Sequence, residues 1–226
     1  MEILPGIHKV DGVNCNCYFV KEPGGWALID TGMPKNDKKI LLYLRGTLGG
    51  QPSDVKTIII THAHVDHVGS LDALKKATGA EVAAHEADAD YIAGKKPAPM
   101  PASRSLKFLL FRLLSPFMKA APVEVDVRLK EHDTVAGLKV IHTPGHTPGS
   151  ICLLNPKRHV LFVGDLVRFV DGKVVGPPIT LDELQVKESM AKISKLEFDV
   201  MLSGHGEPLR PDAAERVREF IKPKRA

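Results

Sequence analysis

The sequence predicts an α/β fold, arranged most simply as a four-layer αββα sandwich. In each half of the chain, short apolar or β-branched runs alternate with segments whose apolar residues recur at helical spacing. Of the 226 residues, 43% are hydrophobic and 26% are charged, which is the balance of a globular protein able to bury its own core. Two sheets with helices outside them account for this pattern, although alternation alone also allows another α/β layout. We expect one domain spanning 1–226.

The first half of the chain is expected to form one sheet and its helices. One helix should begin after Asn36 as its N-cap, and a second should begin after Ser70 and end at Gly79. A turn at Glu22–Gly25 (EPGG) joins the first two expected strands. The expected strands are 15–20, 25–30, 56–60 and 80–84.

The second half is expected to form the other sheet. A capping box from Thr180 to Glu183 predicts the start of a helix that buries Leu184, Met190 and Ile193. A last helix should occupy 212–221, behind Pro211. The expected strands are 124–130, 137–142, 150–154, 159–163 and 198–202.

An apolar, lid-like insertion at about 86–125 interrupts the alternation. Its segment 94–103 is rich in Pro and Lys and predicts a loop, whereas 105–118 is too apolar for a surface helix with one buried face. Three explanations of 105–118 stay open. It is a helix packed as extra core, a wall of an apolar pocket, or a contact for a homodimer or a membrane surface.

The charge and the cysteine content indicate which partners and which cellular compartment to expect. The net charge of +4 is too mild to indicate binding to nucleic acid, and no stable membrane insertion is expected. Cys15, Cys17 and Cys152 are too few for a disulfide scaffold and are expected to be buried free thiols. No secretory signal opens the sequence, so we expect a cytoplasmic protein. The scarcity of Asn and Gln is typical of proteins from heat-loving organisms.

The most informative segment is Thr61-His62-Ala63-His64-Val65-Asp66-His67, which follows an expected buried strand. Because His62 and His64 are two residues apart, an extended backbone turns both rings to the same side. Asp66 and His67 come after the chain bends into the next helix, so they can face a second centre. Imidazoles and carboxylates are ligands for Zn²⁺ and related ions, and the segment therefore predicts a metal site.

Three further candidate ligands each follow an expected strand. His146 lies in a turn rich in Pro and Gly, Asp165 follows Val163-Gly164, and His205 lies between two glycines. Ligands displayed on turns beyond rigid strands suit a preorganised site. The other histidines are expected to be structural or on the surface, with His85 the least certain of them. They are His8, His85, His132, His142 and His159.

Taken in order along the chain, these motifs resemble those of the metallo-β-lactamase-fold hydrolase superfamily, and most closely its glyoxalase-II-like branch. The resemblance also includes Asp30-Thr31-Gly32 near the start. It implies the αββα fold, two Zn²⁺ ions (alternatively Fe or Mn) and a set of roles. One metal would be held by His62, His64 and His146, the other by Asp66, His67 and His205, with Asp165 bridging them and Asp30 supporting the ligands from behind.

The function implied by this resemblance is dinuclear zinc-dependent hydrolysis of ester, lactone or thioester bonds in a small-molecule substrate. A metal-bridging hydroxide would attack the carbonyl carbon, and Asp66 is the candidate catalytic residue that orients it or passes a proton. Glyoxalase II enzymes carry a C-terminal glutathione-binding domain. Because this chain ends soon after His205, we expect substrate choice to depend on the 86–125 insertion.

Other activities of the same fold stay open. A persulfide dioxygenase resembles this chain in its ligands but binds one iron through the positions of His62, His146 and Asp165. A β-lactamase or a nuclease is a further alternative. A non-catalytic binding protein is disfavoured, because such a protein is expected to have lost some of the seven ligands.

Overall fold

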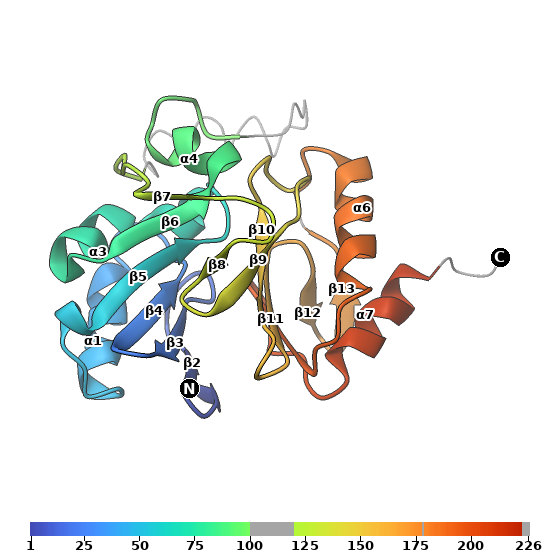
Figure 1. Ribbon diagram of the computed structural model, residues 1–226, viewed down its shortest axis with the longest axis horizontal. Coiled ribbons are helices and arrows are strands. Elements are labelled where there is room, and N and C mark those ends of the chain that lie inside the picture. Colours follow the sequence, from blue (N-terminus) through green and yellow to red (C-terminus); the bar gives the residue numbers. More distant parts are fainter. Residues whose placement is uncertain (100–119, 178, 223–226) are drawn as a thin grey trace.

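The structure, a computed structural model, describes residues 1–99, 120–177 and 179–222. Two β-sheets face each other, and helices cover their outer faces (Figure 1). The larger sheet has its strands in chain order, antiparallel from β1 to β4 and parallel from β4 to β7. These strands are β1 (Glu2–Leu4), β2 (Ile7–Lys9), β3 (Tyr18–Glu22), β4 (Gly25–Ile29), β5 (Val55–Ile60), β6 (Glu81–His85) and β7 (Val127–Leu129).

The smaller sheet has the order β14-β11-β10-β9-β8. Strands β8 to β11 form antiparallel neighbours, whereas β14 pairs with β11 in parallel. A separate hairpin joins β12 (Arg168–Val170) and β13 (Lys173–Val175). The strands of the smaller sheet are β8 (Thr134–Val135), β9 (Leu138–His142), β10 (Ile151–Asn155), β11 (Val160–Gly164) and β14 (Val200–Ser203).

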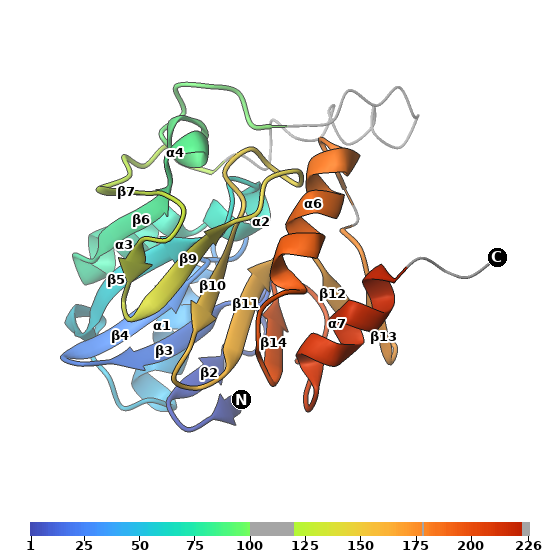
Figure 2. The same cartoon turned by 45° about the vertical axis from the view of Figure 1, so that its right-hand side comes forward.

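The long helices lie on the outer faces of the two sheets (Figure 2). Helices α1 (Asp37–Gly46) and α3 (Leu71–Thr78) cover the larger sheet. Helices α6 (Glu183–Ile193) and α7 (Ala213–Ile221) cover the smaller one. The remaining helical elements are short: η1 (Pro52–Asp54), α2 (Val65–Val68) and α4 (Glu86–Ile92).

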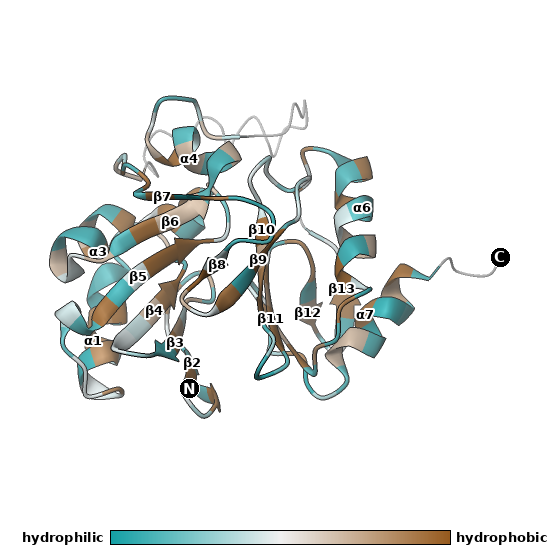
Figure 3. Ribbon diagram, in the orientation of Figure 1, coloured by the Kyte–Doolittle hydropathy of each residue, from teal (hydrophilic) through white to brown (hydrophobic). Residues whose placement is uncertain are grey.

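Three separate apolar layers confirm the predicted αββα sandwich. Successive residues of a strand point to opposite faces, so Ile58 packs towards α1 and α3 while Ile59 packs between the sheets. In β11, Phe162 joins the layer between the sheets and Leu161 joins the layer beneath α6 and α7. Both faces of β11 are therefore buried, and this strand is mostly brown, the colour of hydrophobic residues, in Figure 3.

The start of α6 corrects the prediction for that helix. Its N-cap is Asp182, whose Oδ1 accepts hydrogen bonds from the backbone nitrogens of Leu184 at 2.9 Å and Gln185 at 3.0 Å. The expected capping box at Thr180 is therefore wrong. Leu184 is 67% exposed, and Val186 is buried with Met190 and Ile193 instead.

Two other expected helix starts are confirmed in position. Asn36 and Ser70 directly precede α1 and α3, and Gly79, in the left-handed conformation, ends α3. The Ser70 hydroxyl does not cap its own helix. It accepts hydrogen bonds from the backbone nitrogens of Asn36 and Asp37 at the start of α1. The residue therefore joins the two helices that cover the larger sheet.

The apolar segment 105–118 lies outside the described residues, so none of its three explanations is tested. The beginning of the 86–125 range forms α4, which buries Ala89 and Ile92 beside β6. Within 1–99, 120–177 and 179–222, no helix combines the length and the hydrophobicity needed to cross a membrane. Cys15, Cys17 and Cys152 are buried free thiols, as predicted.

Candidate metal centre

One edge of the sandwich brings the predicted ligands together. His62 and His64 follow the end of β5, and His67 lies in α2 immediately after them. His146 lies in the turn between β9 and β10, from the opposite sheet. Asp165 and His205 follow the ends of β11 and β14, which run in parallel and therefore end at the same edge. The site thus combines loops from both sheets.

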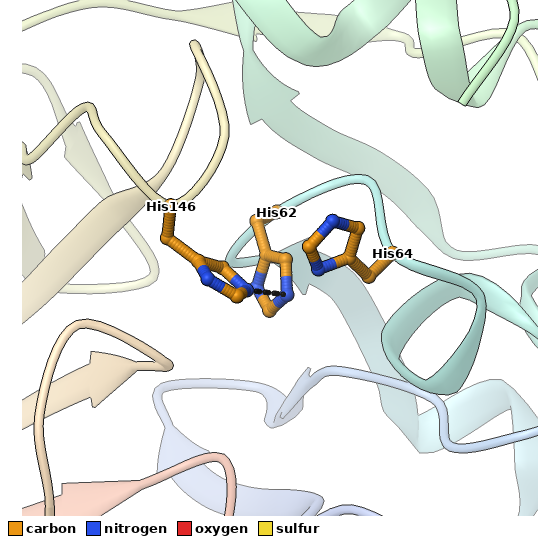
Figure 4. A group of neighbouring side chains, drawn as sticks. All are labelled: His62, His64 and His146. Atoms are coloured by element: carbon orange, nitrogen blue, oxygen red, sulfur yellow. Dashed lines mark hydrogen bonds between the residues drawn. The ribbon is translucent and has the colours of Figure 1, made fainter. Parts of the chain in front are cut away.

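Three histidines form the first cluster. Each of His62, His64 and His146 offers one ring nitrogen, and these atoms lie within 4.8 Å of one another (Figure 4). The Nε2 atoms of His62 and His146 are 3.2 Å apart. Two nitrogens bound to one tetrahedral zinc ion lie about 3.4 Å apart, so the spacing fits a shared cation.

Asp66, His67 and His205 form the second cluster, again with ligand atoms within 4.8 Å of one another. The Nε2 atom of His205 lies 3.0 Å from Oδ2 of Asp66. These two side chains are 28% and 31% exposed, whereas His67 is fully buried. The second cluster therefore combines one buried ligand with two that are partly exposed.

Asp165 lies between the two clusters. Its Oδ2 atom is 3.7 Å from Nε2 of His146 in the first cluster and 3.5 Å from Nε2 of His205 in the second. Its Oδ1 atom is 3.6 Å from Nε2 of His67. A single carboxylate is therefore placed to contact two cations at once.

Hydrogen bonds at the outer ring nitrogens orient three of the histidines. A carbonyl oxygen only accepts, so His146 donates from Nδ1 to Ile179 O at 2.7 Å, and His64 donates from Nε2 to Pro99 O at 3.2 Å. His67 donates from Nδ1 to Asp30 Oδ2 at 2.8 Å. In each ring the other nitrogen faces the centre, and the outer hydrogen bond is the usual second contact of a metal-ligating histidine.

Thr61 extends the same arrangement to His62. Its hydroxyl donates to Asp30 Oδ2 at 2.8 Å and lies 3.1 Å from Nδ1 of His62, from which it accepts. The backbone nitrogen of Thr61 donates to Asp30 Oδ1 at 2.8 Å. Asp30 was predicted as a supporting residue, but Thr61 was missed, because its hydroxyl gains this role only through a contact with a distant strand.

The electrostatics of the first cluster favour neutral rings. Burial, followed by the neighbouring imidazoles, lowers the pKa of His62 well below its ordinary value. Burial likewise lowers the pKa of His146 to about 4. Both rings are therefore neutral at neutral pH, and their close nitrogens are suited to sharing a cation.

The second cluster carries negative charge. Burial raises the pKa of Asp66, but the hydrogen bond from His205 and the nearby imidazoles lower it by more. The net shift is downward, so this carboxyl is ionised. Burial lowers the pKa of His67, whereas Cys15 and then the carboxylates of Asp30 and Asp165 raise it well above its ordinary value. These carboxylates thus favour positive charge at this point of the site, which a bound cation supplies.

Two buried polar atoms test whether the residues suit a metal. Among the described residues, neither Nε2 of His67 nor Oδ1 of Asp165 has a hydrogen-bond partner. Leaving such atoms unpaired costs about 1–3 kcal/mol each, so buried polar atoms normally have partners. Both atoms face the space between the clusters. The donor set of five imidazoles and two carboxylates, with these two atoms unpaired, fits divalent metal ions.

The other histidines do not join these clusters. His85 stacks on His142 with ring centroids 3.8 Å apart, and its Nδ1 accepts from the backbone nitrogen of Ala87. His8 contacts Trp26 and Tyr43 by the edges of the rings. His132 and His159 have exposed side chains. All five are therefore outside the candidate centre, as expected.

Comparison with known proteins agrees with this geometry. The family model of the metallo-beta-lactamase superfamily matches residues 10–205. The probable metallo-hydrolase YflN of Bacillus subtilis (strain 168) is 32% identical over 230 residues, covering 92% of this chain and 86% of that protein. The acyl-coenzyme A thioesterase MBLAC2 of Bos taurus is 27% identical over 188 residues, covering 73% of this chain and 61% of that protein.

A solved structure, TTHA1623 in a di-iron-bound form, is similar in fold. It superposes with a TM-score of 0.69 and 26% sequence identity, covering 95% of this chain and 98% of that one. With the family match over most of the chain, these findings define the class. The chain belongs to the metallo-beta-lactamase superfamily, and it is a hydrolase of that superfamily.

Proposed function

We propose that this protein is a dinuclear metal-dependent hydrolase of ester, lactone or thioester bonds, from the glyoxalase-II-like branch of the superfamily. The observation that carries the proposal is the position of Asp165 between two clusters of three ligands each. His62, His64 and His146 would hold one ion, Asp66, His67 and His205 the other, and Asp165 would contact both. Zinc is the metal we favour for this nitrogen- and oxygen-rich donor set, with iron or manganese as alternatives.

When bound, a pair of such ions polarises a substrate carbonyl and makes water a strong nucleophile at neutral pH. Asp66 is the residue of this chain that we assign to proton handling. Its carboxylate is ionised and partly exposed, and it accepts a hydrogen bond from His205. It can therefore accept a hydrogen bond from a nucleophile and orient it, whereas Asp30 and Thr61 hold the rings of His67 and His62 in place.

Two relatives support the substrate class and the number of metals. The acyl-coenzyme A thioesterase MBLAC2 supports a thioester as substrate, and the di-iron-bound form of TTHA1623 supports a pair of metals. The chemistry that we propose is attack on a carbonyl carbon. We propose that the 86–125 insertion contributes to substrate choice, because its Pro99 carbonyl already contacts His64 in the first cluster.

Metal analysis combined with a hydrolysis panel tests this proposal. Purified protein should contain two zinc ions per chain, and it should cleave one or more of the lactones, aryl esters, acyl-coenzyme A thioesters and glutathione thioesters. β-Lactams and phosphotriesters serve as comparison substrates on the same metal-quantified protein. One iron per chain with oxygen uptake on a persulfide, and no hydrolysis, would instead indicate the dioxygenase.

A further inference from the structure

Asp88 is a fully buried carboxylate that the sequence analysis did not select. It lies in α4, directly after β6, where the expected helical and strand patterns become irregular. An aspartate is rarely buried to this degree unless its oxygens have partners. The partners of Asp88 are therefore informative about its role.

Three donors converge on this carboxylate from two loops. The backbone nitrogen of Ala63 donates to Oδ2 at 2.8 Å, and the hydroxyl of Thr147 donates to the same atom at 2.7 Å. The backbone nitrogen of Gly149 donates to Oδ1 at 2.7 Å. Hydrogen bonds to an ionised acceptor are roughly twice as strong as neutral ones.

These donors belong to the two loops that carry the first ligand cluster. Ala63 lies between His62 and His64, and Thr147 directly follows His146. The first loop extends the larger sheet and the second extends the smaller sheet, so their relative position is not set by pairing within either sheet. One backbone hydrogen bond, from the nitrogen of Ile151 to the carbonyl oxygen of Thr61 at 3.0 Å, joins the bases of the two loops directly. Asp88 is bonded to both loops further along, next to the histidines themselves.

Packing against Gly149 shows that this contact is tight. A Cβ atom at Gly149 would lie 2.5 Å from the backbone nitrogen of Asp88 and 2.6 Å from its Cγ. Only glycine allows the turn to approach α4 this closely. The hydroxyl of Ser150 reinforces the same turn by accepting from the backbone nitrogen of Thr147 at 3.0 Å.

We propose that Asp88 is a positioning residue that holds the His62–His64 loop and the His146 turn at the spacing needed to bind one metal ion. The inference rests on the proposed metal centre and adds a residue that determines the affinity of its first cluster. Second contacts of this kind change metal affinity by about 10–100-fold when they are removed. The second cluster, Asp66, His67 and His205, has no hydrogen bond to Asp88 among the described residues.

Asp88→Asn is the most direct test, because asparagine keeps the shape of aspartate but replaces one oxygen by an amide that donates. It cannot accept from all three donors. The effect is measured as the dissociation constant for Zn²⁺ by chelator competition. Asp88→Asn is added to two parent variants, each of which already impairs one of the two clusters. In His205→Ala, adding Asp88→Asn should weaken the remaining tight site by about 10–100-fold. In His64→Ala, it should change the remaining site by less than about threefold.

Matched variants separate positioning from general destabilisation. Asp126→Asn alters another carboxylate that accepts a backbone hydrogen bond, from Val82 at 2.8 Å, away from both clusters, and it should leave both affinities unchanged. Thr147→Val should weaken the first site, and Thr147→Ser, which keeps the hydroxyl, should restore it. This pair decides the question if Asp88→Asn does not fold.

The outcomes distinguish this inference from the proposed function. Equal Zn²⁺ affinity with and without Asp88→Asn in the His205→Ala background, in folded protein, would overturn the inference and leave the proposed function intact. Equal losses at both clusters would also overturn it, since they indicate a general structural role. Failure of the unaltered protein to bind any divalent metal would overturn the proposed function and the inference together.

Discussion

His67 donates from Nδ1 to Oδ2 of Asp30 at 2.8 Å, and both side chains are buried. The same carboxylate accepts two hydrogen bonds from Thr61, which in turn contacts His62. One aspartate at the end of β4 therefore orients a histidine of each proposed cluster. Its backbone is in the left-handed conformation, with φ of 58°.

Asp30→Asn should weaken metal binding without changing the backbone. Asparagine tolerates a positive φ, so the turn is preserved, but its amide group cannot accept from all three donors. We expect the affinity for Zn²⁺ to fall by about 10–100-fold, measured by chelator competition. Circular dichroism should report an unchanged fold, and wild-type affinity in this variant would contradict the role given to Asp30.

Asp165→Ala and His62→Ala should abolish hydrolysis while leaving the protein folded. Asp165 lies 3.5–3.7 Å from ligand atoms of both clusters, so its removal affects both proposed ions, whereas His62 belongs to the buried side of the centre. The measurement is turnover of the best panel substrate together with metal content per chain. Full activity in either variant would refute the metal assignment.

Gly204→Ala tests how closely the chain must approach the centre. A Cβ atom at this position would collide with Oδ1 of Asp165 and with the ring of His67. Because the ring of His67 is held by its hydrogen bond to Asp30 and both side chains are buried, we expect a loss of about 1–3 kcal/mol in stability and at least a tenfold loss of activity.

Gly46→Ala is the matched control for Gly204→Ala. Gly46 is the last residue of α1, and a Cβ atom there has no neighbour within 4 Å. Alanine at this position should raise the free energy of unfolding by about 0.5–1 kcal/mol and leave activity unchanged. If both variants behaved alike in urea denaturation and in activity, the steric account of Gly204 would be wrong.

The fold and the clustering of candidate ligands could be predicted because both depend on short-range patterns. Apolar runs such as Lys56–Ile60 (KTIII) mark buried strands, and a ligand such as Asp165 directly follows a strand, so its place at the sheet edge follows from topology. The spacing of His62 and His64 was equally local. The structure brings all seven predicted residues together, and their role as ligands stays a prediction.

Contacts between distant segments could not be predicted in this way. Asp88 and Thr61 are ordinary polar residues in the sequence, and they gain their roles only when loops of both sheets meet. The start of α6 was misjudged for a related reason. Thr180 and Asp182 both suit an N-cap, and the hydrogen bonds of Asp182 to Leu184 and Gln185 decide the choice and leave Leu184 exposed.

The stacked pair His85 and His142 predicts a pH dependence that is separate from the candidate centre. Burial, and then the neighbouring His142, lower the pKa of His85 to about 4, although three nearby carboxyl groups raise it in part. These groups are Glu86, Glu131 and Asp133. In the unfolded chain the pKa of a histidine is about 6.5. Protonation therefore favours unfolding, so this contribution to stability is complete above about pH 6.5 and is lost as the pH falls towards 4.

His85→Asn should remove this dependence and keep the helix start. The Nδ1 atom of His85 accepts from the backbone nitrogen of Ala87 at the beginning of α4, and asparagine is a favourable N-cap that can accept the same bond. Free energies of unfolding in urea, with a chelator present throughout, should fall less for the variant than for the wild type between pH 7.5 and pH 4.5. Parallel declines in the two proteins would show that other groups set the acid sensitivity.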